Sequence, residues 1–333
     1  MKFRPSSITV ICLISLFAIL TPAQARRHDT TVELVDFDGW HDAYRISNGI
    51  VDVVVVPGVG RIMQYCFTGH PETSPIWVNP DVAGKPAVGG WQNYGGDKVW
   101  PAPQGDWGKH MHQDRNWPPD PAIDPGAFTI SRIDSGVRLT GSPVVSFAMT
   151  ISRDIVVEPG TSKVEITDTF AKSPDATGDA DGFPIGIWNV TQTRGDETAY
   201  LPFDPNSQSV SGGFVAINEG TPDPTFRGVN WTIGKDELTI TTKGLPRGNK
   251  VGVDDPSGVV RESSPNGIVF VEKFDYTAGG PYLDNGTDAQ VYANDNPEYL
   301  EIEAHSPGRN LKAGESMSRT ITWNLLKPGQ SEP

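Results

Sequence analysis

Short β-prone runs separated by turn residues recur along almost the whole chain, and this pattern restricts the fold more than any other feature. The chain contains 36 glycines and 29 prolines among its 333 residues, and many of the runs are bounded by them. No run shows the apolar i, i+3, i+4, i+7 stripe of an amphipathic helix. The sequence therefore predicts an all-β fold, either a large antiparallel sandwich or a barrel.

The clearest hairpin is predicted where Asn48-Gly49 separates residues 43–47 from residues 50–56, because Asn-Gly supplies the positive φ angles of a type I′ turn. Further strands are predicted at 61–67, 127–133, 144–157, 163–170, 183–190, 229–233, 237–241, 267–274, 289–292, 299–305 and 316–325. No period of 20 to 50 residues repeats, which argues against a propeller or a solenoid. The composition is even, without a linker, so residues 26–333 are expected to form one domain.

The first 25 residues have the three parts of a secretory signal peptide. Lys2 and Arg4 give the positive n-region, residues 8–20 the apolar h-region, and Ala23-Gln24-Ala25 the cleavage site. The apolar stretch is too short to span a bilayer, so no membrane insertion is expected. We expect export after cleavage behind Ala25, to the periplasm or the medium, and favour the periplasm because no surface-anchor signal is recognisable.

Acidic residues outnumber basic ones, with 41 Asp and Glu against 27 Lys and Arg. Removal of Lys2 and Arg4 with the signal peptide leaves 25 basic residues against the same 41 acidic ones, a net charge of −16. A surface of this charge repels nucleic acid and anionic lipid headgroups. We therefore expect no nucleic-acid partner, whereas a neutral substrate, a cationic partner or bound calcium remains compatible.

Residues 90–121, GWQNYGGDKVWPAPQGDWGKHMHQDRNWPPDP, hold four of the nine tryptophans. Glycine and proline are so dense here that we predict loops, and neither a helix nor a central strand. Aromatic rings on loops often cover a ligand. We interpret the stretch as the wall of a carbohydrate pocket, with Trp107 and Trp117 stacking on a sugar and Trp100 plugging the core.

The same stretch carries polar candidates, among them Gln104. His110 and His112 could share a transition metal, but no third ligand can be identified, so no metal is expected. Gly95-Gly96-Asp97-Lys98 lacks the spacing and the strand-to-helix context of a phosphate loop. We predict instead a tight turn that presents Asp97 and Lys98, and no cofactor.

Residues 299–305 are informative because side chains alternate between the two faces of a strand. One face receives the small or apolar side chains of Leu300, Ile302 and Ala304. The other receives Tyr299, Glu301, Glu303 and His305. Two carboxylates and an imidazole on one face indicate either a solvated edge strand or a functional site, and the strand alone leaves both interpretations open.

Three segments carry a family resemblance: NGIVDVVVVPGVGRIMQYCF at 48–67, GGDKVWPAPQ at 95–104 and EYLEIEAHSP at 298–307. In this order they resemble secreted bacterial members of the galactose mutarotase-like (aldose 1-epimerase) superfamily, over residues 44–325. The resemblance implies a supersandwich of long antiparallel sheets with a sugar site on a concave face. It also implies epimerase chemistry, in which a glutamate takes the anomeric proton and a histidine protonates the ring oxygen.

The resemblance implies roles for particular residues. Glu301 matches the catalytic glutamate, with Glu303 facing the same way, and Arg61 matches an early arginine that binds sugar hydroxyls or holds the acid. The His-Gly-Gly and His-x-x-Tyr-Phe-Asn motifs of the enzymes are absent, and no histidine occurs between residues 128 and 304. The acid could therefore be His110 or His112, or an altered acid such as Lys98 or Asp97.

These expectations define two sets of site residues and three classes of function. The catalytic set is Glu301, Glu303, His110 and His112, and the substrate-binding set is Arg61, Asp97, Lys98, Gln104, Trp107, Trp117 and His305. The first function is an epimerase-like isomerase acting on a mono- or oligosaccharide. The alternatives are a non-catalytic carbohydrate-binding protein of the cell envelope and a structural module that binds no sugar. The sequence does not determine the oligomeric state.

Overall fold

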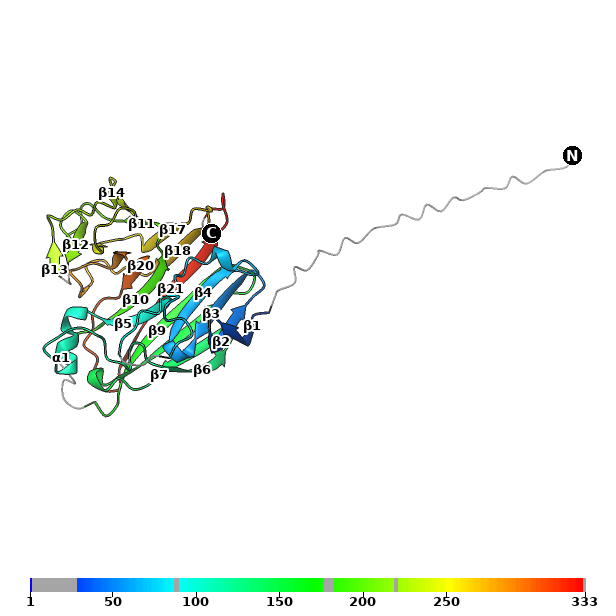
Figure 1. Ribbon diagram of the computed structural model, residues 1–333, viewed down its shortest axis with the longest axis horizontal. Helices are drawn as coiled ribbons and strands as arrows, with labels where there is room; N and C mark the ends of the chain where they lie inside the picture. Colours follow the sequence, from blue (N-terminus) through cyan, green and yellow to red (C-terminus); the bar gives the residue numbers. More distant parts are fainter. Residues whose placement is uncertain (2–28, 87–89, 177–182, 219–220, 332–333) are drawn as a thin grey trace.

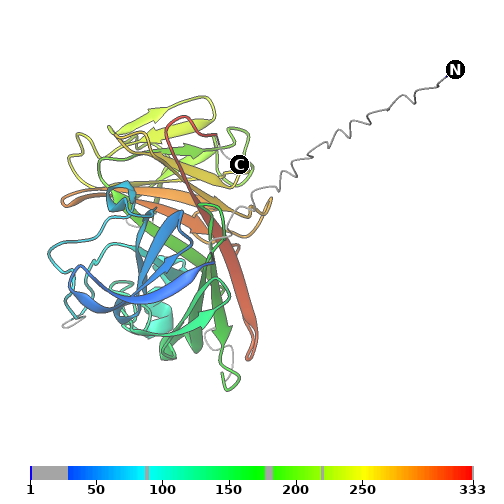
Figure 2. The ribbon, with the colours of Figure 1, turned by 90° about the vertical axis from the view of Figure 1, so that its right-hand side faces the viewer.

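Two large antiparallel sheets form nearly all of the protein, which confirms the all-β prediction (Figures 1 and 2). The structure is a computed structural model that describes residues 1, 29–86, 90–176, 183–218 and 221–331. Residues 2–25 of the expected signal peptide lie outside the described residues, so that expectation stays a prediction.

Within the described residues, the first sheet has eleven strands. In spatial order they are β1 (Thr31–Phe37), β2 (Trp40–Ser47), β3 (Val51–Val56), β4 (Arg61–Phe67), β5 (Asp97–Ala102), β10 (Gly186–Arg194), β20 (Glu298–His305), β19 (Ala289–Asp295), β16 (Asn249–Val253), β12 (Phe214–Asn218) and β13 (Thr221–Asp223).

The second sheet, in the part of the chain that the structure describes, has ten strands. In spatial order they are β14 (Trp231–Ile233), β15 (Glu237–Ile240), β11 (Thr198–Pro202), β17 (Val259–Ser263), β18 (Val269–Phe274), β21 (Ser316–Leu326), β9 (Val164–Lys172), β8 (Met149–Val157), β7 (Gly136–Gly141) and β6 (Phe128–Ile133). The helical turns in the described chain are η1 (Pro57–Val59), η2 (Pro71–Thr73), η3 (Gln104–Asp106), η4 (Val145–Phe147) and the short helix α1 (Trp107–Met111).

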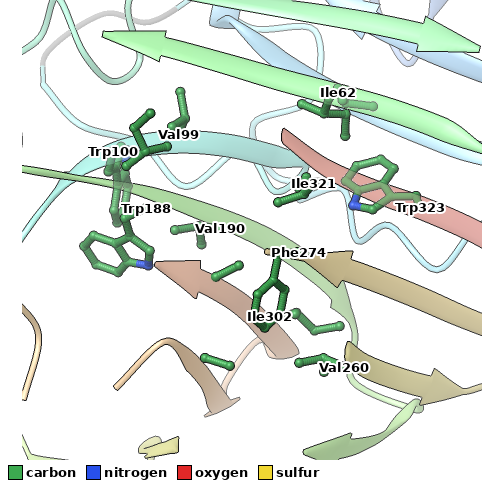
Figure 3. Packing of buried hydrophobic residues seen from close by; sticks show 14 of the residues in the cluster. Ile62, Val99, Trp100, Trp188, Val190, Val260, Phe274, Ile302, Ile321 and Trp323 are labelled. Carbon is green, nitrogen blue, oxygen red and sulfur yellow. The ribbon is translucent and has the colours of Figure 1, made fainter. Parts of the chain in front are cut away.

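The hydrophobic core joins the two sheets. Along β8 buried and half-buried residues alternate over the whole strand, as expected for a strand with one face on the core. Figure 3 shows members of the cluster from both sheets: Ile62, Val99 and Ile302 from the first, and Phe274, Ile321 and Trp323 from the second. The opposite face of the first sheet is therefore left for other contacts.

The predicted hairpin between β2 and β3 is present, but its turn is not of type I′. Gly49 has a φ of 79°, whereas Asn48 does not adopt a positive φ. The Asn48 side chain instead accepts hydrogen bonds from the backbone N–H groups of Ile50 and Val51. It also donates to two carbonyl oxygens of the β8–β9 turn, and these contacts hold Asn48 outside the left-handed region.

The prediction that residues 90–121 contain neither a central strand nor a helix is wrong. Gly95 and Gly96, with φ angles of 83° and 75°, turn the chain into β5, which pairs with β10 along its whole length. On its other side β5 pairs with β4 only at Asp97, so Pro101 lies where a neighbouring strand needs no N–H donor. The helix α1 follows and ends at His112, which has a φ of 53°.

Other strand boundaries also differ from the prediction. The strand expected at 144–157 begins only at Met149, because η4 and the left-handed Ala148 precede it. Among the described residues, seven further strands with weak or short β-prone patterns were not predicted: β1, β7, β11, β12, β13, β16 and β17. For β11, β12 and β16, pairing with strands distant in the sequence contributes, and the local sequence does not show it. By contrast, β1 and β7 pair with strands that are close in the sequence.

Candidate functional site

A hollow of about 860 Å³ lies over the first sheet, between the segment that contains Trp91, η3 and Trp117 and the segment that leads from β12 to β16. In Figure 1, α1 and the strands β12 and β13 lie on opposite sides of β10 and β20. The aromatic and charged side chains that line the hollow include Trp91, Trp100, Trp117, Trp188, Tyr292, Tyr299, Arg247, Lys250, Glu301 and Glu303.

Strand register explains why distant residues meet in the hollow. Glu301 on β20 is the register partner of Gln192 on β10 and of Tyr292 on β19. Tyr292 is in turn the partner of Lys250 on β16. Register partners present their side chains to the same face of a sheet. The side chains around Glu301 therefore come from three other strands, β10, β19 and β16, and the register of the sheet brings them together.

The predicted alternation along β20 is confirmed. Tyr299, Glu301 and Glu303 all line the hollow. The intervening residues Leu300 and Ile302 are fully buried in the core cluster. The face with the carboxylates is therefore not a solvated outer face of an edge strand, because β20 lies between β10 and β19 in the middle of the sheet.

Glu301 is held through one of its two carboxylate oxygens. Gln192 donates its Nε2–H to Oε1 at 2.9 Å, and Lys98 Nζ lies 3.5 Å from the same oxygen. Burial raises the pKa of Glu301, although the Lys98 ammonium acts in the opposite direction. This environment brings the carboxyl group closer to the range in which it can exchange protons near neutral pH.

Arg61 lies behind the hollow and does not line it. Its guanidinium is fully buried and donates to Asp124 at 2.6 Å and to the Gly95 carbonyl oxygen at 2.5 Å. It also donates to the side-chain oxygen of Gln192 at 3.5 Å, the residue that binds Glu301. Direct contact with a sugar does not fit this geometry. The other expected role, holding the acid in place, stays a prediction, and Arg61 instead contacts Gln192, which donates to Glu301.

Glu303 forms the most enclosed ion pair of the hollow. Its side chain is fully buried, and Oε2 lies 2.6 Å from Lys250 Nζ and accepts a hydrogen bond of 2.8 Å from Trp188 Nε1. Oε1 has no hydrogen-bond partner. Burial disfavours the Lys250 ammonium, but the carboxylates of Glu303, Asp284 and Glu301 together outweigh burial and raise the pKa of Lys250 above its ordinary value.

Asp97 and Lys98, adjacent on β5, point to opposite faces of the sheet. The Lys98 ammonium lies 4.5 Å from the centre of the Trp100 ring, beside Glu301, and burial lowers its pKa. Asp97 faces the second sheet, where Arg153 donates to it at 2.5 Å, and burial raises its pKa to about 6. The structure therefore brings Lys98 to the edge of the site but places Asp97 between the sheets.

The predicted histidines do not reach the hollow. His110 is buried against Phe147, with the ring centres 4.1 Å apart, and His112 is exposed at the end of α1. His305 is stacked on Trp188 at 5.4 Å, with Nε2 3.7 Å from Glu303. Burial lowers the pKa of His305 to about 3, so its ring is neutral at pH 7. No histidine occurs among the described residues that line the hollow.

The tryptophans that line the hollow are not all the ones that were predicted to do so. Trp107 is buried, donates to the Pro101 carbonyl oxygen at 2.7 Å and does not line the hollow, because α1 turns it inward. Trp100, expected to plug the core, is buried but contributes to the wall, as do Trp117 and Gln104. Trp117 is 40% exposed and meets Trp91 edge to face at 4.6 Å, so it is available for a ligand.

Sequence reasoning missed several residues of the hollow. Trp188 lies in a predicted strand. Because side chains alternate between the two faces along a strand, the same reasoning applied there would have suggested the face on which Trp188 lies. Lys250 lies in β16, a strand that was not predicted, and nothing around it in the sequence distinguishes it from a surface lysine. Pairing with Tyr292 on β19 is what brings it to Glu303.

The described residues contain no group of three or more His, Cys, Asp or Glu side chains arranged to hold a metal ion. In the same part of the chain, no helix has both the length and the apolar character needed to cross a membrane.

The two sheets, with a hollow on the outer face of one of them, define the galactose mutarotase-like fold. Solved structures support this assignment. Galactose 1-epimerase from Lactobacillus acidophilus matches with a TM-score of 0.53 at 12% identity, over 90% of this chain and 99% of that one. A galactose mutarotase-like protein from Clostridium acetobutylicum gives a TM-score of 0.55 at 12% identity, with the same coverage.

A galactose mutarotase-like protein from Lactobacillus casei matches with a TM-score of 0.54 at 10% identity, over 85% of this chain and 100% of that one. No family model matches the sequence, and no curated protein matches it. The resemblance to the galactose mutarotase-like superfamily is thereby confirmed at the level of the fold.

Proposed function

We propose that this is an exported carbohydrate-active protein whose hollow binds a sugar and interconverts its anomers by general acid–base catalysis. The observation that carries the proposal is the combination of aromatic walls with Glu301 and Glu303 in one hollow, each carboxylate paired with a lysine. Export, to the periplasm or the medium, is supported by the pattern of the first 25 residues.

The walls suit the recognition of sugar rings. Trp91, Trp117 and Tyr299 present aromatic surface, on which the C–H groups of a pyranose pack. The carboxylates of Glu301 and Glu303 can accept hydrogen bonds from sugar hydroxyls. Aromatic side chains and convergent polar groups together line this enclosure of several hundred Å³, which is within the size range of small-molecule sites.

Glu301 is the base in this proposal. Both of its contacts, with Gln192 and with Lys98, involve Oε1, which leaves Oε2 for the anomeric hydroxyl. As Oε2 takes the hydroxyl proton, the oxygen forms a carbonyl with C1 and the bond from C1 to the ring oxygen breaks. The ring oxygen then takes a proton, the C1–C2 bond rotates, and the reverse steps close the other anomer.

Lys98, which lies behind the residues that line the hollow, is the acid in this proposal because it is paired with Glu301. It lies beside Glu301, and the lowered pKa brings its ammonium nearer to the range useful for proton transfer. The hydroxyl oxygen and the ring oxygen are bonded to the same carbon, so one closely spaced acid–base pair can serve both. Asp97, the other altered acid expected from the sequence, faces the second sheet.

Substitution Glu301→Gln tests this assignment. We expect the rate of anomer exchange of galactose and glucose, measured by NMR, to fall by about 10²- to 10⁴-fold, while binding is largely retained. Glu298→Gln is the matched control, because Glu298 is on the same strand but exposed and outside the hollow. Unchanged exchange in Glu301→Gln would remove Glu301 as the base.

The second candidate is a carbohydrate-binding protein without turnover. It is favoured by one observation, namely that no described residue lining the hollow is a histidine. In this case the wild-type protein binds a sugar, as seen by tryptophan fluorescence, and leaves the rate of anomer exchange at the uncatalysed value. The same pair of measurements therefore distinguishes the two functions.

A further inference from the structure

The hollow is much longer than one sugar ring. Its lining includes one residue from each of six adjacent strands: Trp100 on β5, Trp188 on β10, Glu301 on β20, Tyr292 on β19, Lys250 on β16 and Ile217 on β12. Neighbouring strands are about 4.8 Å apart, so the hollow extends for about 24 Å across the sheet. A pyranose built from bonds of about 1.5 Å spans only roughly 6 Å.

The volume leads to the same conclusion. At the density of liquid water, about 30 Å³ per molecule, the twelve non-hydrogen atoms of a hexose occupy at most about 360 Å³. This is less than half of the hollow of about 860 Å³. A monosaccharide bound at Glu301 would therefore leave most of the lined surface in contact with water.

Glu301 does not lie at the centre of the hollow. Two strand spacings, about 10 Å, separate β20 from β5, and three spacings, about 14 Å, separate it from β12. The shorter part ends at the tryptophan side, where Trp91 and Trp117 stand. It holds one ring, and the longer part has room for further rings.

The longer part ends in polar groups that have no other contacts with the described chain. Arg247 and Asn218 are both exposed and line the hollow, and neither side chain makes a hydrogen bond or ion pair with another described residue. A guanidinium carries five N–H donors, which suit the several hydroxyl and ring oxygens of a sugar. The far end therefore offers a second polar contact region, separate from Glu301.

We propose that the hollow takes a reducing oligosaccharide of at least two units. The reducing ring lies between Glu301 and the tryptophan side, and the remaining units extend over β19, β16 and β12 towards Arg247. This inference rests on the proposed sugar-binding function and adds the length of the ligand and its direction.

The first test compares chain lengths in tryptophan fluorescence titrations of the mature protein. The probes are glucose with cellobiose and cellotriose, glucose with maltose and maltotriose, and galactose with β-1,4-galactobiose. In at least one series we expect affinity to rise by about tenfold or more from one unit to two, since the second ring adds hydrogen bonds and buried surface. Equal affinity for the monosaccharide and its oligomers in every series that binds would overturn the inference.

The second test uses Arg247→Ala. We expect it to weaken binding of the disaccharide or trisaccharide by about fivefold, the value of one ordinary hydrogen bond, and to leave monosaccharide binding unchanged. Lys243→Ala is the control, because Lys243 is exposed on the same segment but does not line the hollow. Equal weakening for all lengths, or none for any, would contradict the proposed direction.

The outcomes also separate this inference from the proposed function. If affinity rises with the length of the sugar but the protein does not accelerate anomer exchange, the oligosaccharide inference is supported and the catalytic role is removed. If the protein accelerates anomer exchange of monosaccharides but affinity does not depend on sugar length, the catalytic role is supported and the oligosaccharide inference is overturned. Failure of every sugar in the panel to bind would overturn both.

Discussion

Lys250→Met removes the cation of the most enclosed ion pair in the hollow. Glu303 is fully buried, and its Oε2 would keep only the Trp188 N–H at 2.8 Å as a partner. Removing one member of a buried pair costs about 3 to 5 kcal/mol. The Lys250 side chain is 15% exposed and Trp188 continues to donate, so we expect the lower end, about 3 kcal/mol.

The loss can be measured by urea unfolding and by thermal denaturation. Roughly 300 ordered residues give an unfolding entropy near 0.6 kcal/mol per kelvin, so a loss of about 3 kcal/mol lowers Tm by about 5 °C. Lys243→Met is the control and should change stability by less than about 0.5 kcal/mol, because Lys243 is exposed and lies outside the ion pair.

A double-mutant cycle gives the decisive result. In Lys250→Met with Glu303→Gln neither member of this pair carries a charge, and the glutamine carbonyl oxygen can still accept the Trp188 N–H. We expect the double variant to be more stable than Lys250→Met, with a coupling energy of about 2 kcal/mol. A cost below about 1 kcal/mol for Lys250→Met, or additive costs in the cycle, would refute the reasoning.

Two further predictions concern the core and the N-terminus. The folded protein keeps His305 neutral down to a pKa of about 3, whereas the unfolded chain protonates it near 6.5, so stability falls as pH drops below 6.5. From pH 7 to pH 5 this effect lowers the free energy of unfolding of the wild-type protein by about 2 kcal/mol. The free energy of unfolding of His305→Phe should fall by about 2 kcal/mol less over the same pH range. Equal losses for the two proteins in urea unfolding would disprove the prediction. The exported protein should begin at Arg26, and N-terminal sequencing that finds Met1 on the mature protein would contradict export by a cleaved signal peptide.

The fold class and the orientation of β20 were predictable because both follow from local rules. Alternation along residues 299–305 depends only on strand geometry, and it correctly placed Glu301 and Glu303 on the same face. The aromatic stretch was correctly connected to the hollow through Trp117 and Gln104. Its secondary structure was not, because pairing with β10 stabilises β5 in spite of Pro101.

The roles of individual side chains near β5 depended on information that the sequence does not display. Asp97 and Lys98 are adjacent in sequence but lie on opposite faces, so at most one of them could belong to the site. The second sheet decides which of the two faces the hollow, because Arg153 on β8 binds Asp97 on the side between the sheets. Similarly, α1 turned Trp107 into the core although its neighbours in the sequence are polar.

Glu301, the proposed base, was easier to place from the sequence than the residues around it, and the reason is geometric. Glu301 belongs to a strand whose own pattern shows its direction, whereas its neighbours arrive from other strands. Gln192 lies 109 residues earlier on β10, and Lys98 lies still earlier on β5. Each contact requires a long-range pairing, and each pairing sets its register over a whole strand. A shift of one residue between β5 and β10 would exchange Lys98 for Asp97 or Val99 beside Glu301. The chemistry of the hollow therefore depends on the register of the sheet as much as on the residues themselves.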